Sequence, residues 1–358
     1  MHLARLRLRD YRNYARLDAA FSPGFHLILG DNAQGKTNLL EALYLVSTLR
    51  SFRGVGSAHL VRQGAKGYFV GAQVVGQSQQ EAQLYWSPSE RRVSLNGKAV
   101  QRITDYLGVF QAVVFCSEDL QLVKGTGRIR RRFVDLLLTQ TQPGYLALLQ
   151  RYARALRSRN ALLRQHGVDE AALASFSREL IAAGEAIIAA RSRLIPALTP
   201  FVEDAHARIA AGREKLSIVY HPQVKGDFAV ELAQSRHRER SQRLTVVGPH
   251  RDELLLHVNE QPAARFGSEG QKRTIALALK MAQAAWLQQS NGTPPVLLID
   301  DVMGELDLRR RSGLIPLLDQ VAAGRGQVFM TCTEENWPRE LGREIRRWQV
   351  REGTLHSA

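Results

Sequence analysis

The sequence contains little cysteine and no long apolar segment. Only two of its 358 residues are cysteines, Cys116 and Cys332, and they lie far apart in the chain. Within one chain they can build neither a disulfide framework nor a Cys-x-x-Cys zinc site. Apolar runs such as Val296 to Ile299 are far shorter than the ~20 residues of a membrane helix, and the N-terminal residues alternate charged and apolar side chains rather than forming a signal-peptide core. We therefore expect a soluble, cytoplasmic protein with no membrane partner.

Acidic residues are fewer than basic ones. Lys and Arg together number 49 against 34 Asp and Glu, which gives a formal net charge of +15. Most of the basic residues are arginines, whose planar guanidinium suits bidentate phosphate contacts. The charge favours a polyanionic partner, with nucleic acid as the first candidate, and a generally basic surface is the alternative. The 44% hydrophobic and 23% charged fractions are typical of folded globular proteins and exclude a disordered chain.

The N-terminal part of the chain has the pattern of an α/β protein. Apolar residues predict strands within residues 1–30, and helical spacing from Lys36 onward predicts a helix that ends near residues 50–54. Short alternating runs over 67–100, with a hairpin turn at Asn96-Gly97, predict a small antiparallel sheet.

The middle of the chain is predicted to be helical. Residues 128–211 repeat apolar side chains at three- and four-residue steps, and Pro196 and Pro200 are expected to kink or end the second helix of this insertion. Strand patterns return at 216–220, and the α/β part then resumes. The predicted domains are an N-terminal part of an α/β head at 1–117, a mainly helical arm at 118–243, and a C-terminal part of the head at 244–358.

Residues 30–37 match the phosphate-binding pattern G-x-x-x-x-G-K-[ST] and lie between a predicted strand and a predicted helix. The glycines let backbone N–H groups point at the β-phosphate, and the helix N-terminus adds positive potential. Lys36 is expected to reach the β/γ oxygens, and Thr37 is expected to supply a hydroxyl to Mg²⁺. A glycine-rich turn that merely caps a helix is the structural alternative.

A second motif places two carboxylates after a wholly apolar strand. Residues 296–299 are Val-Leu-Leu-Ile, and Asp300 and Asp301 follow them. This is the pattern of a buried parallel strand whose carboxyl end opens on the site. We expect Asp300 to hold Mg²⁺ through water and Asp301 to polarise the attacking water as general base.

A third motif begins the helix predicted after Ser268. Taken alone, Ser268 with Gln271 three residues later is a helix capping box. Its position before the acidic strand, which is followed by residues 304–307 (Gly-Glu-Leu-Asp), resembles the order in ABC-type ATPases. In those proteins the capped helix start of one subunit contacts the γ-phosphate held by the other, so the resemblance implies an anion site acting in trans.

The chain resembles the RecF family, bacterial recombination-repair ATPases of the SMC-like branch of ABC proteins, over its whole length. The resemblance implies an α/β fold, namely an ABC-type (SMC-like) P-loop ATPase head with a smaller inserted helical domain. It also implies ATP-dependent homodimerisation, binding to double-stranded DNA and to junctions with single-stranded gaps, and, with RecR and RecO, help in RecA loading in DNA repair and the SOS response. Such a protein would be cytoplasmic and nucleoid-associated. The segments that carry the resemblance are residues 8–14, 30–38, 50–53, 118–125, 130–135, 248–252 and 298–307.

The site residues expected from motifs and resemblance fall into four groups. Lys36, Asp300 and Asp301 are the expected catalytic residues, and Thr37 and Asp300 are the expected Mg²⁺ ligands. The expected ATP-binding residues are Gly30, Asp31, Asn32, Ala33, Gln34, Gly35, Lys36, Thr37, Asn38, Ser268, Gly270 and Gln271. The candidate DNA-binding residues, from the densest basic stretch, are Arg128, Arg130, Arg131, Arg132, Arg154 and Arg157, although a solvated helix face is the ordinary interpretation of such a run.

The chain departs from the usual ABC pattern in three places. Asp301 stands where Glu is typical, which suggests slow hydrolysis. The resemblance further implies that this hydrolysis depends on DNA. No switch histidine is present, since the predicted strand near Thr331 offers only hydroxyls there. The ABC pattern also includes a Gln in a lid loop, and this chain has two candidates for that position, Gln111 and, as a substitute, Glu118.

The sequence leaves two roles open for His250 and Arg251. They follow a Gly-Pro turn, where they would either face a phosphate or lie in an ordinary surface turn.

Two other classes of protein are alternatives to this family. The nucleotide-binding subunit of an ABC transporter would lack the helical insertion and would not need the net charge. A P-loop kinase would have no use for the Ser268 motif.

Overall fold

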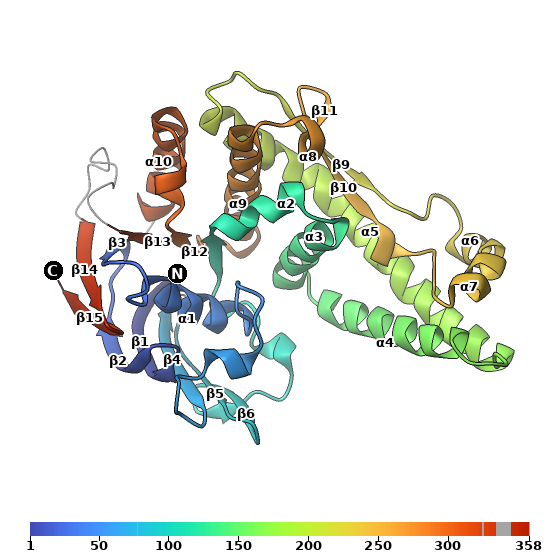
Figure 1. Cartoon of the computed structure of the whole chain (residues 1–358), viewed down its shortest axis with the longest axis horizontal. Helices are drawn as coiled ribbons and strands as arrows, with labels where there is room; N and C mark the ends of the chain where they lie inside the picture. Colours follow the sequence, from blue (N-terminus) through green and yellow to red (C-terminus); the bar gives the residue numbers. More distant parts are fainter. Residues whose placement is uncertain (77, 324–325, 334–344, 358) are drawn as a thin grey trace. The chain divides into compact units, whose positions relative to one another are not determined.

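The computed structural model describes residues 1–76, 78–323, 326–333 and 345–357. By its contacts the chain divides into two compact units (Figure 1). The head unit comprises Met1–Asp119, Asp204–Glu214 and Arg273–Ala358, and the arm unit comprises Leu120–Glu203 and Lys215–Lys272. This division differs from the predicted domains in three segments, because residues 118–119 and 204–214 group with the head and residues 244–272 group with the arm.

The head contains a six-stranded, mostly parallel sheet. Its strands, in order across the sheet, are β15 (Thr354–Ser357), β14 (Ile345–Arg351), β3 (Gly24–Leu29), β13 (Gln327–Cys332), β12 (Val296–Asp300) and β8 (Ala112–Phe115). All pairs are parallel except the β14–β15 hairpin. The strands β8 and β13 are buried along their whole length, which agrees with the wholly apolar sequence of β8 and the mainly apolar sequence of β13. The carboxyl ends of β3, β12 and β13 meet at one edge, which positions the motifs that follow them.

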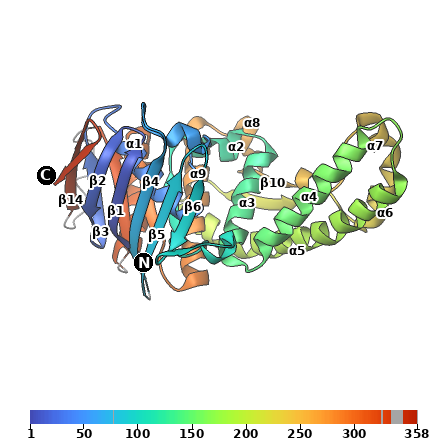
Figure 2. The same ribbon diagram turned by 90° about the horizontal axis from the view of Figure 1, so that it is seen from below.

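The second six-stranded sheet of the head is antiparallel (Figure 2). Its strands, in order, are β2 (Tyr14–Ala20), β1 (His2–Tyr11), β4 (Tyr68–Val75), β5 (Gln79–Trp86), β6 (Arg91–Leu95) and β7 (Lys98–Ala99). The predicted sheet over 67–100 is confirmed, and β1 and β2 extend it. Asn96 and Gly97 both have positive φ, as the predicted hairpin turn requires.

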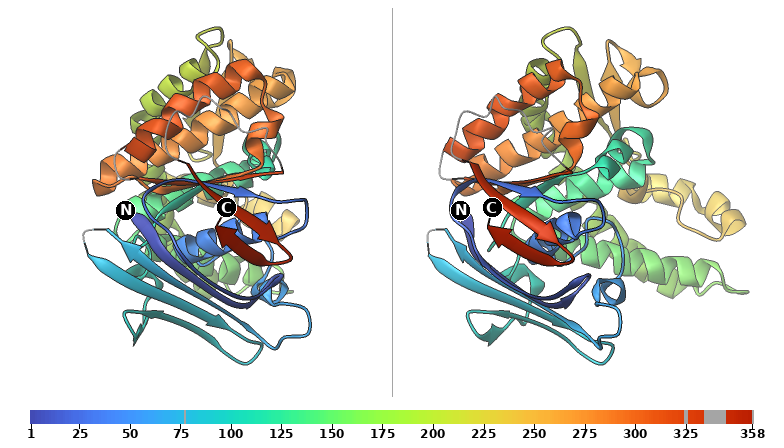
Figure 3. Two further views of the ribbon diagram at one scale, coloured as in Figure 1. Left: turned by 90° about the vertical axis from the view of Figure 1, so that its left-hand side faces the viewer. Right: turned by 60° about the vertical axis from the view of Figure 1, so that its left-hand side comes forward.

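Helix α1 (Lys36–Thr48) contacts strands of both sheets and therefore lies between them (Figure 3). Its residues Leu39, Leu40, Leu43 and Val46 are buried on one side, and Ala42 and Leu45 are buried on another, so the helix carries apolar side chains on most of its surface. Helix α10 (Leu308–Ala323) packs against β3 and β13. The remaining helices that lie at least partly in the head are η1 (Ser57–Leu60), η2 (Ile103–Asp105), η3 (Ser117–Leu120), α5 (Glu170–Ile209), α9 (Glu269–Asn291) and η5 (Val302–Glu305).

The arm unit is built mainly from helices, as predicted. Its elements are α2 (Gln121–Lys124), α3 (Gly127–Thr141), α4 (Tyr145–Leu163), α5 (Glu170–Ile209), β9 (Leu216–His221), α6 (Phe228–Gln234), α7 (Arg236–Gln242), η4 (Pro249–Arg251), β10 (Glu253–Val258), β11 (Gln261–Pro262) and α8 (Ala263–Phe266). The three strands form a small antiparallel sheet in the order β11-β10-β9. No helix in the described ranges combines the length and apolarity needed to cross a membrane.

Helix α5 does not end at either proline. It continues past Pro196 and Pro200 to Ile209, so of the two expected effects, a kink or an end, the helix end is wrong. Both prolines are exposed, and so is Ser192, whose carbonyl would otherwise accept the hydrogen bond that Pro196 does not donate. Because water can satisfy a carbonyl on this side, the helix loses little by continuing.

Candidate active site

The loop after β3 curls because two of its residues are glycines. Gly30 has φ 146° and Gly35 has φ 118°. A Cβ atom on Gly30 would lie 2.4 Å from the carbonyl oxygen of Val350, and one on Gly35 would lie 2.6 Å from the Asn13 side chain. No larger residue fits either position. Since Gly35 is the N-cap of α1 and has no side chain to fold over the first amides, these N–H groups are open to an anion.

The outer turn of this loop consists of Asp31, Asn32 and Ala33, which are all exposed. The side chain of Lys36 is buried beneath it. Its Nζ donates to the carbonyl oxygens of Gly30 at 2.5 Å and Asp31 at 2.9 Å. Burial lowers the pKa of this ammonium, while the Asp301 and Asp300 carboxylates act in the opposite direction. The cation is thus already inside the loop, held by backbone oxygens that phosphate oxygens can replace.

Thr37, Asp300 and Thr331 form a connected group of oxygens. The Oδ1 atom of Asp300 accepts hydrogen bonds from the hydroxyls of Thr37 at 2.9 Å and Thr331 at 3.0 Å. Thr331 Oγ1 also accepts from the N–H of Asp301 at 3.0 Å. Burial raises the pKa of Asp300, and its two hydroxyl donors partly offset this. The predicted pair Thr37 and Asp300 is brought together, and the sequence did not assign Thr331 its central place between the two carboxylates.

Asp301 differs from Asp300 in its surroundings. It has φ 55°, in the left-handed region, and is exposed, so its carboxylate is accessible to water. Burial raises its pKa, with Glu305 adding to the rise and Lys36 opposing it. One carboxylate is thus held inside by hydroxyls while its neighbour faces solvent, and the two environments suit the different roles expected of them.

The side chain of Asn13 holds the phosphate-binding loop in place by two hydrogen bonds. Its Nδ2 donates to the carbonyl of Gln34 at 2.7 Å, and its Oδ1 accepts from the side chain of Asn38 at 2.9 Å. The hydroxyl of Tyr14 donates to the carbonyl of Gly35 at 3.0 Å. Asn13 and Tyr14 lie in a segment that carries the family resemblance, and no role was predicted for either of them.

The turn between β14 and β15 supports the same loop. The backbone N–H of Gly353 donates to the carbonyl of Gln34 at 3.0 Å, and that of Glu352 donates to its Oε1 at 2.7 Å. Gln34 is therefore held by segments from both ends of the chain.

Gln111 is not the lid-loop residue. It precedes β8, which is parallel to β12, so it lies at the amino edge of the sheet while Asp300 lies at the carboxyl edge. It is 2% exposed, and its Oε1 accepts from Asn291. Glu118 follows β8 at the correct edge and is exposed. Asp119, beside it, is anchored by the N–H of Cys116 at 2.9 Å and by Lys280 at 3.4 Å.

The segment after β12 is tied to two other parts of the head. The Glu305 carboxylate accepts from the hydroxyl of Ser117 at 2.7 Å, and its carbonyl accepts from Arg273 Nη1 at 2.6 Å. Ser117 belongs to η3 and Arg273 to α9. The loop after β8, the helix after Ser268 and the acidic strand are thus joined through one residue.

The capping box at Ser268 is confirmed. The N–H of Ser268 donates to Gln271 Oε1 at 2.7 Å, and the N–H of Gln271 donates to Ser268 Oγ at 3.2 Å. Ser268 is exposed, and Gly270 is half-buried. The role of these residues toward a second subunit stays a prediction.

Two of the candidate DNA-binding arginines are used inside the arm. Arg130 donates to Glu253 at 2.7 Å and to the carbonyl of Gly125 at 2.9 Å, and Arg131 donates to the carbonyl of Asp252. Their guanidinium groups are therefore occupied by the fold. The others remain exposed, namely Arg128, Arg132, Arg154 and Arg157.

His250 is a structural residue in this fold. Its Nδ1 lies 2.6 Å from the Tyr152 hydroxyl and its Nε2 lies 3.2 Å from the carbonyl of Thr245. Burial lowers its pKa to about 4, so the ring is neutral at pH 7. A neutral ring with both nitrogens engaged does not suit a phosphate contact, whereas Arg251 is exposed.

The fold and this site define a P-loop ATPase head of the ABC type, in its SMC-like branch. Residues 2–355 match the family described as RecF/RecN/SMC N terminal domain. The Smc head domain of Pyrococcus furiosus has the same fold, with a TM-score of 0.61 over 100% of this chain at 16% identity.

More similar proteins narrow the family. The "DNA replication and repair protein RecF" of Symbiobacterium thermophilum is 37% identical over 99% of this chain and 98% of its own length. The protein of that name from Thermosynechococcus vestitus is 40% identical over 93% of this chain and 91% of its own. A structure described as the recombination mediator protein RecF with ATP in the RecFOR pathway superposes with a TM-score of 0.91 at 29% identity, covering 100% of this chain and 97% of that one. The chain belongs to the RecF family of DNA replication and repair proteins.

Proposed function

We propose that this chain is an ATP-dependent, DNA-binding recombination mediator. In this proposal it dimerises with ATP on duplex DNA and at gap junctions, and with RecO and RecR it promotes RecA loading. The observation that carries the proposal is the group formed by Lys36, Thr37 and Asp300 at the open N-terminus of α1, in a chain whose relative is described as RecF with ATP.

The oxygens of Thr37 and Asp300 fit a magnesium ion. They lie 2.9 Å apart at the carboxyl edge of the parallel sheet, and hard oxygen donors are the ligands this ion prefers. These two residues would hold Mg²⁺, which would neutralise charge on the β- and γ-phosphates. The amides of α1 and the Lys36 ammonium bind the same phosphates from the loop side.

In this proposal Asp301 accepts a proton from the attacking water. Its carboxylate is exposed, and partial burial raises its pKa, which makes it a stronger base than an unperturbed aspartate. Its side chain is a methylene shorter than glutamate, which agrees with slow turnover of ATP to ADP and phosphate.

Association would depend on the triphosphate. In this proposal the capped helix start at Ser268 presents an anion site to the γ-phosphate held by the second copy in the dimer. ADP has no γ-phosphate and would not join the copies. The exposed arm residues Arg128, Arg132, Arg154 and Arg157 are then the proposed duplex contacts.

Sedimentation and DNA retention test the proposal. Wild-type protein is expected to dimerise with ATP and to be retained on duplex DNA with ATP but not with ADP. Lys36→Ala is expected to lose nucleotide binding, whereas Ser268→Arg is expected to bind ATP as a monomer. Ser78→Arg, at an exposed position of the head, adds the same bulk and charge as a control and should dimerise normally. Normal dimerisation of Ser268→Arg would refute the role in trans.

A further inference from the structure

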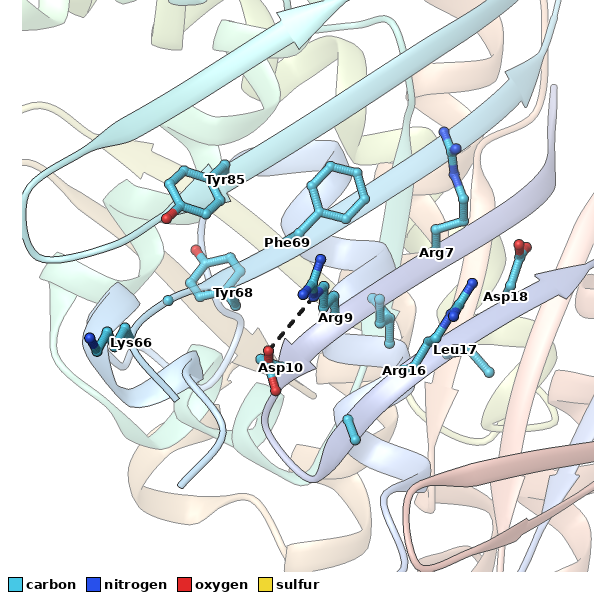
Figure 4. Close-up of a pocket in the computed structure, with 13 residues that line it drawn as sticks. Arg7, Arg9, Asp10, Arg16, Leu17, Asp18, Lys66, Tyr68, Phe69 and Tyr85 are labelled. Atoms are coloured by element: carbon cyan, nitrogen blue, oxygen red, sulfur yellow. Dashed lines mark ion pairs between the residues drawn. The ribbon is translucent and has the colours of Figure 1, made fainter. Parts of the chain in front are cut away.

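The antiparallel sheet of the head has one face that carries cations and aromatic rings. Along β1 the residues Leu6 and Leu8 point into the core, so the alternating residues Arg7 and Arg9 point outward. The outer face contains a shallow hollow of about 940 Å³ over β2, β1, β4 and β5 (Figure 4).

Strand register aligns four of these outward side chains in one row. Arg16 pairs with Arg9, Arg9 pairs with Phe69, and Phe69 pairs with Tyr85. The row runs perpendicular to the strands across β2, β1, β4 and β5, so it spans roughly 14 Å at the usual strand spacing. Two cations therefore stand beside two aromatic rings on a continuous surface, as Figure 4 shows.

The cations of this row are exposed and weakly paired. The Arg9 side chain is 80% exposed, and its carboxylate neighbour Asp10 is 4.0 Å away. Arg16 and Lys66, at the margins of the hollow, form no ion pair with any described residue. By contrast, Arg7 is paired with Glu81, so the positive charge is concentrated at the row itself.

The rings are accessible as well. Tyr85 is 39% exposed although it is a large hydrophobic residue, and Phe69 is half-buried. Gly71, two residues along β4, leaves room beside Phe69, because a Cβ atom there would lie 2.9 Å from the Phe69 ring. Both rings therefore offer part of their surface to a partner.

We propose that this face, the Arg16–Arg9–Phe69–Tyr85 row, binds single-stranded DNA. Unpaired bases stack on aromatic rings while arginines and lysines neutralise the phosphates of the same strand, a combination found on sheet platforms that bind single strands. A duplex would meet the cations but not the rings, because its bases are stacked inside. The inference deepens the proposed function, since it assigns the unpaired strand at a gap junction to a surface. It does not require ATP, because the row includes no residue of the nucleotide site.

Fluorescence anisotropy with a labelled oligothymidylate, without nucleotide, tests the proposal. Tyr85→Ala is expected to weaken binding by about ten-fold, and Tyr85→Phe is expected to restore it. Replacing Arg9 and Arg16 together by alanine should reduce the slope of log K against log salt by about 1.4. Arg213→Ala, which removes an exposed charge elsewhere in the head, is the matched control and should have little effect.

Three results would overturn the proposal. These are unchanged affinity of Tyr85→Ala, an equal loss in Arg213→Ala, and an equal loss of duplex binding in Tyr85→Ala, which would make the face a duplex contact. Lys36→Ala separates this proposal from the proposed function, because it should keep oligothymidylate binding while losing ATP-dependent dimerisation. Loss of ATP-dependent duplex retention alone would refute only the proposed function.

Discussion

Replacing Thr331 by valine would test how the hydroxyl between the two carboxylates works. Valine has nearly the same shape but cannot donate to Asp300 or accept from the N–H of Asp301. The loss of a hydrogen bond to a carboxylate costs about 1.5–3 kcal/mol, and the unsatisfied N–H adds about 1–3 kcal/mol. Because the two effects share one side chain and are not additive, we expect a total of about 2–4 kcal/mol in the free energy of unfolding.

The same substitution should change the pH dependence of turnover. The Thr331 hydroxyl lowers the pKa of Asp300, so its removal should raise that pKa further. Asp300 must be ionised to bind a cation, and the acid limb of the ATPase profile should therefore move to higher pH, with a higher Mg²⁺ requirement.

Three measurements check this reasoning: ATPase rate against pH, rate against Mg²⁺ concentration, and denaturant unfolding. Thr331→Ser keeps the hydroxyl and should behave like the parent in the first two. If Thr331→Val has an unshifted acid limb and the parent's Mg²⁺ requirement, Thr331 does not control the ionisation of Asp300.

The remaining predictions concern three other residues. Asp301→Asn should allow ATP binding and dimerisation but slow single-turnover hydrolysis by about 10²-fold or more, since an amide cannot accept a proton; parent-like turnover would move the base to another residue. Asn13→Ala should weaken ATP binding by about ten-fold because the loop loses two hydrogen bonds, measured by calorimetry against Asn13→Asp as a partial replacement. Burial lowers the pKa of His26 to about 4, below its unfolded value near 6.5. As the pH falls, the unfolded state therefore takes up this proton before the folded state does. A contribution of about 3 kcal/mol to the free energy of unfolding is present above pH 6.5 and is lost as pH falls toward 4. Unfolding curves against pH should show this loss, and His26→Gln should flatten it.

The motifs of the site could be predicted because each is local in sequence. The loop at 30–37, the carboxylates after β12 and the capping box at Ser268 all have their geometry determined within a few residues, and the structure confirms this local geometry. Their mutual contacts depend on strand order, which local patterns do not reveal. Thr331 meets Asp300 only because β13 pairs with β12 in a particular register.

The incorrect expectations have the same origin. Gln111 was one of two candidates for the lid-loop residue, but strand direction places it at the opposite edge of the sheet from Asp300. Arg130 and Arg131 were predicted as DNA contacts because they belong to a charged run. In the structure their guanidinium groups donate hydrogen bonds to residues of β10 and of the turn before it. The continuation of α5 beyond Pro196 depends on which side of the helix faces water, and this is set by packing.

The order of strands in the central sheet has a consequence for synthesis on the ribosome. Strand β3, near the start of the chain, lies between β13 and β14, near its end. At roughly 5–20 residues per second, β3 waits about 15–60 s for its neighbours to be made. During this time its apolar face and its backbone groups have no native partner in the sheet. The arm residues are synthesised before β13 and β14, and the phosphate-binding loop would gain its hydrogen bond from Gly353 only after both strands had been made.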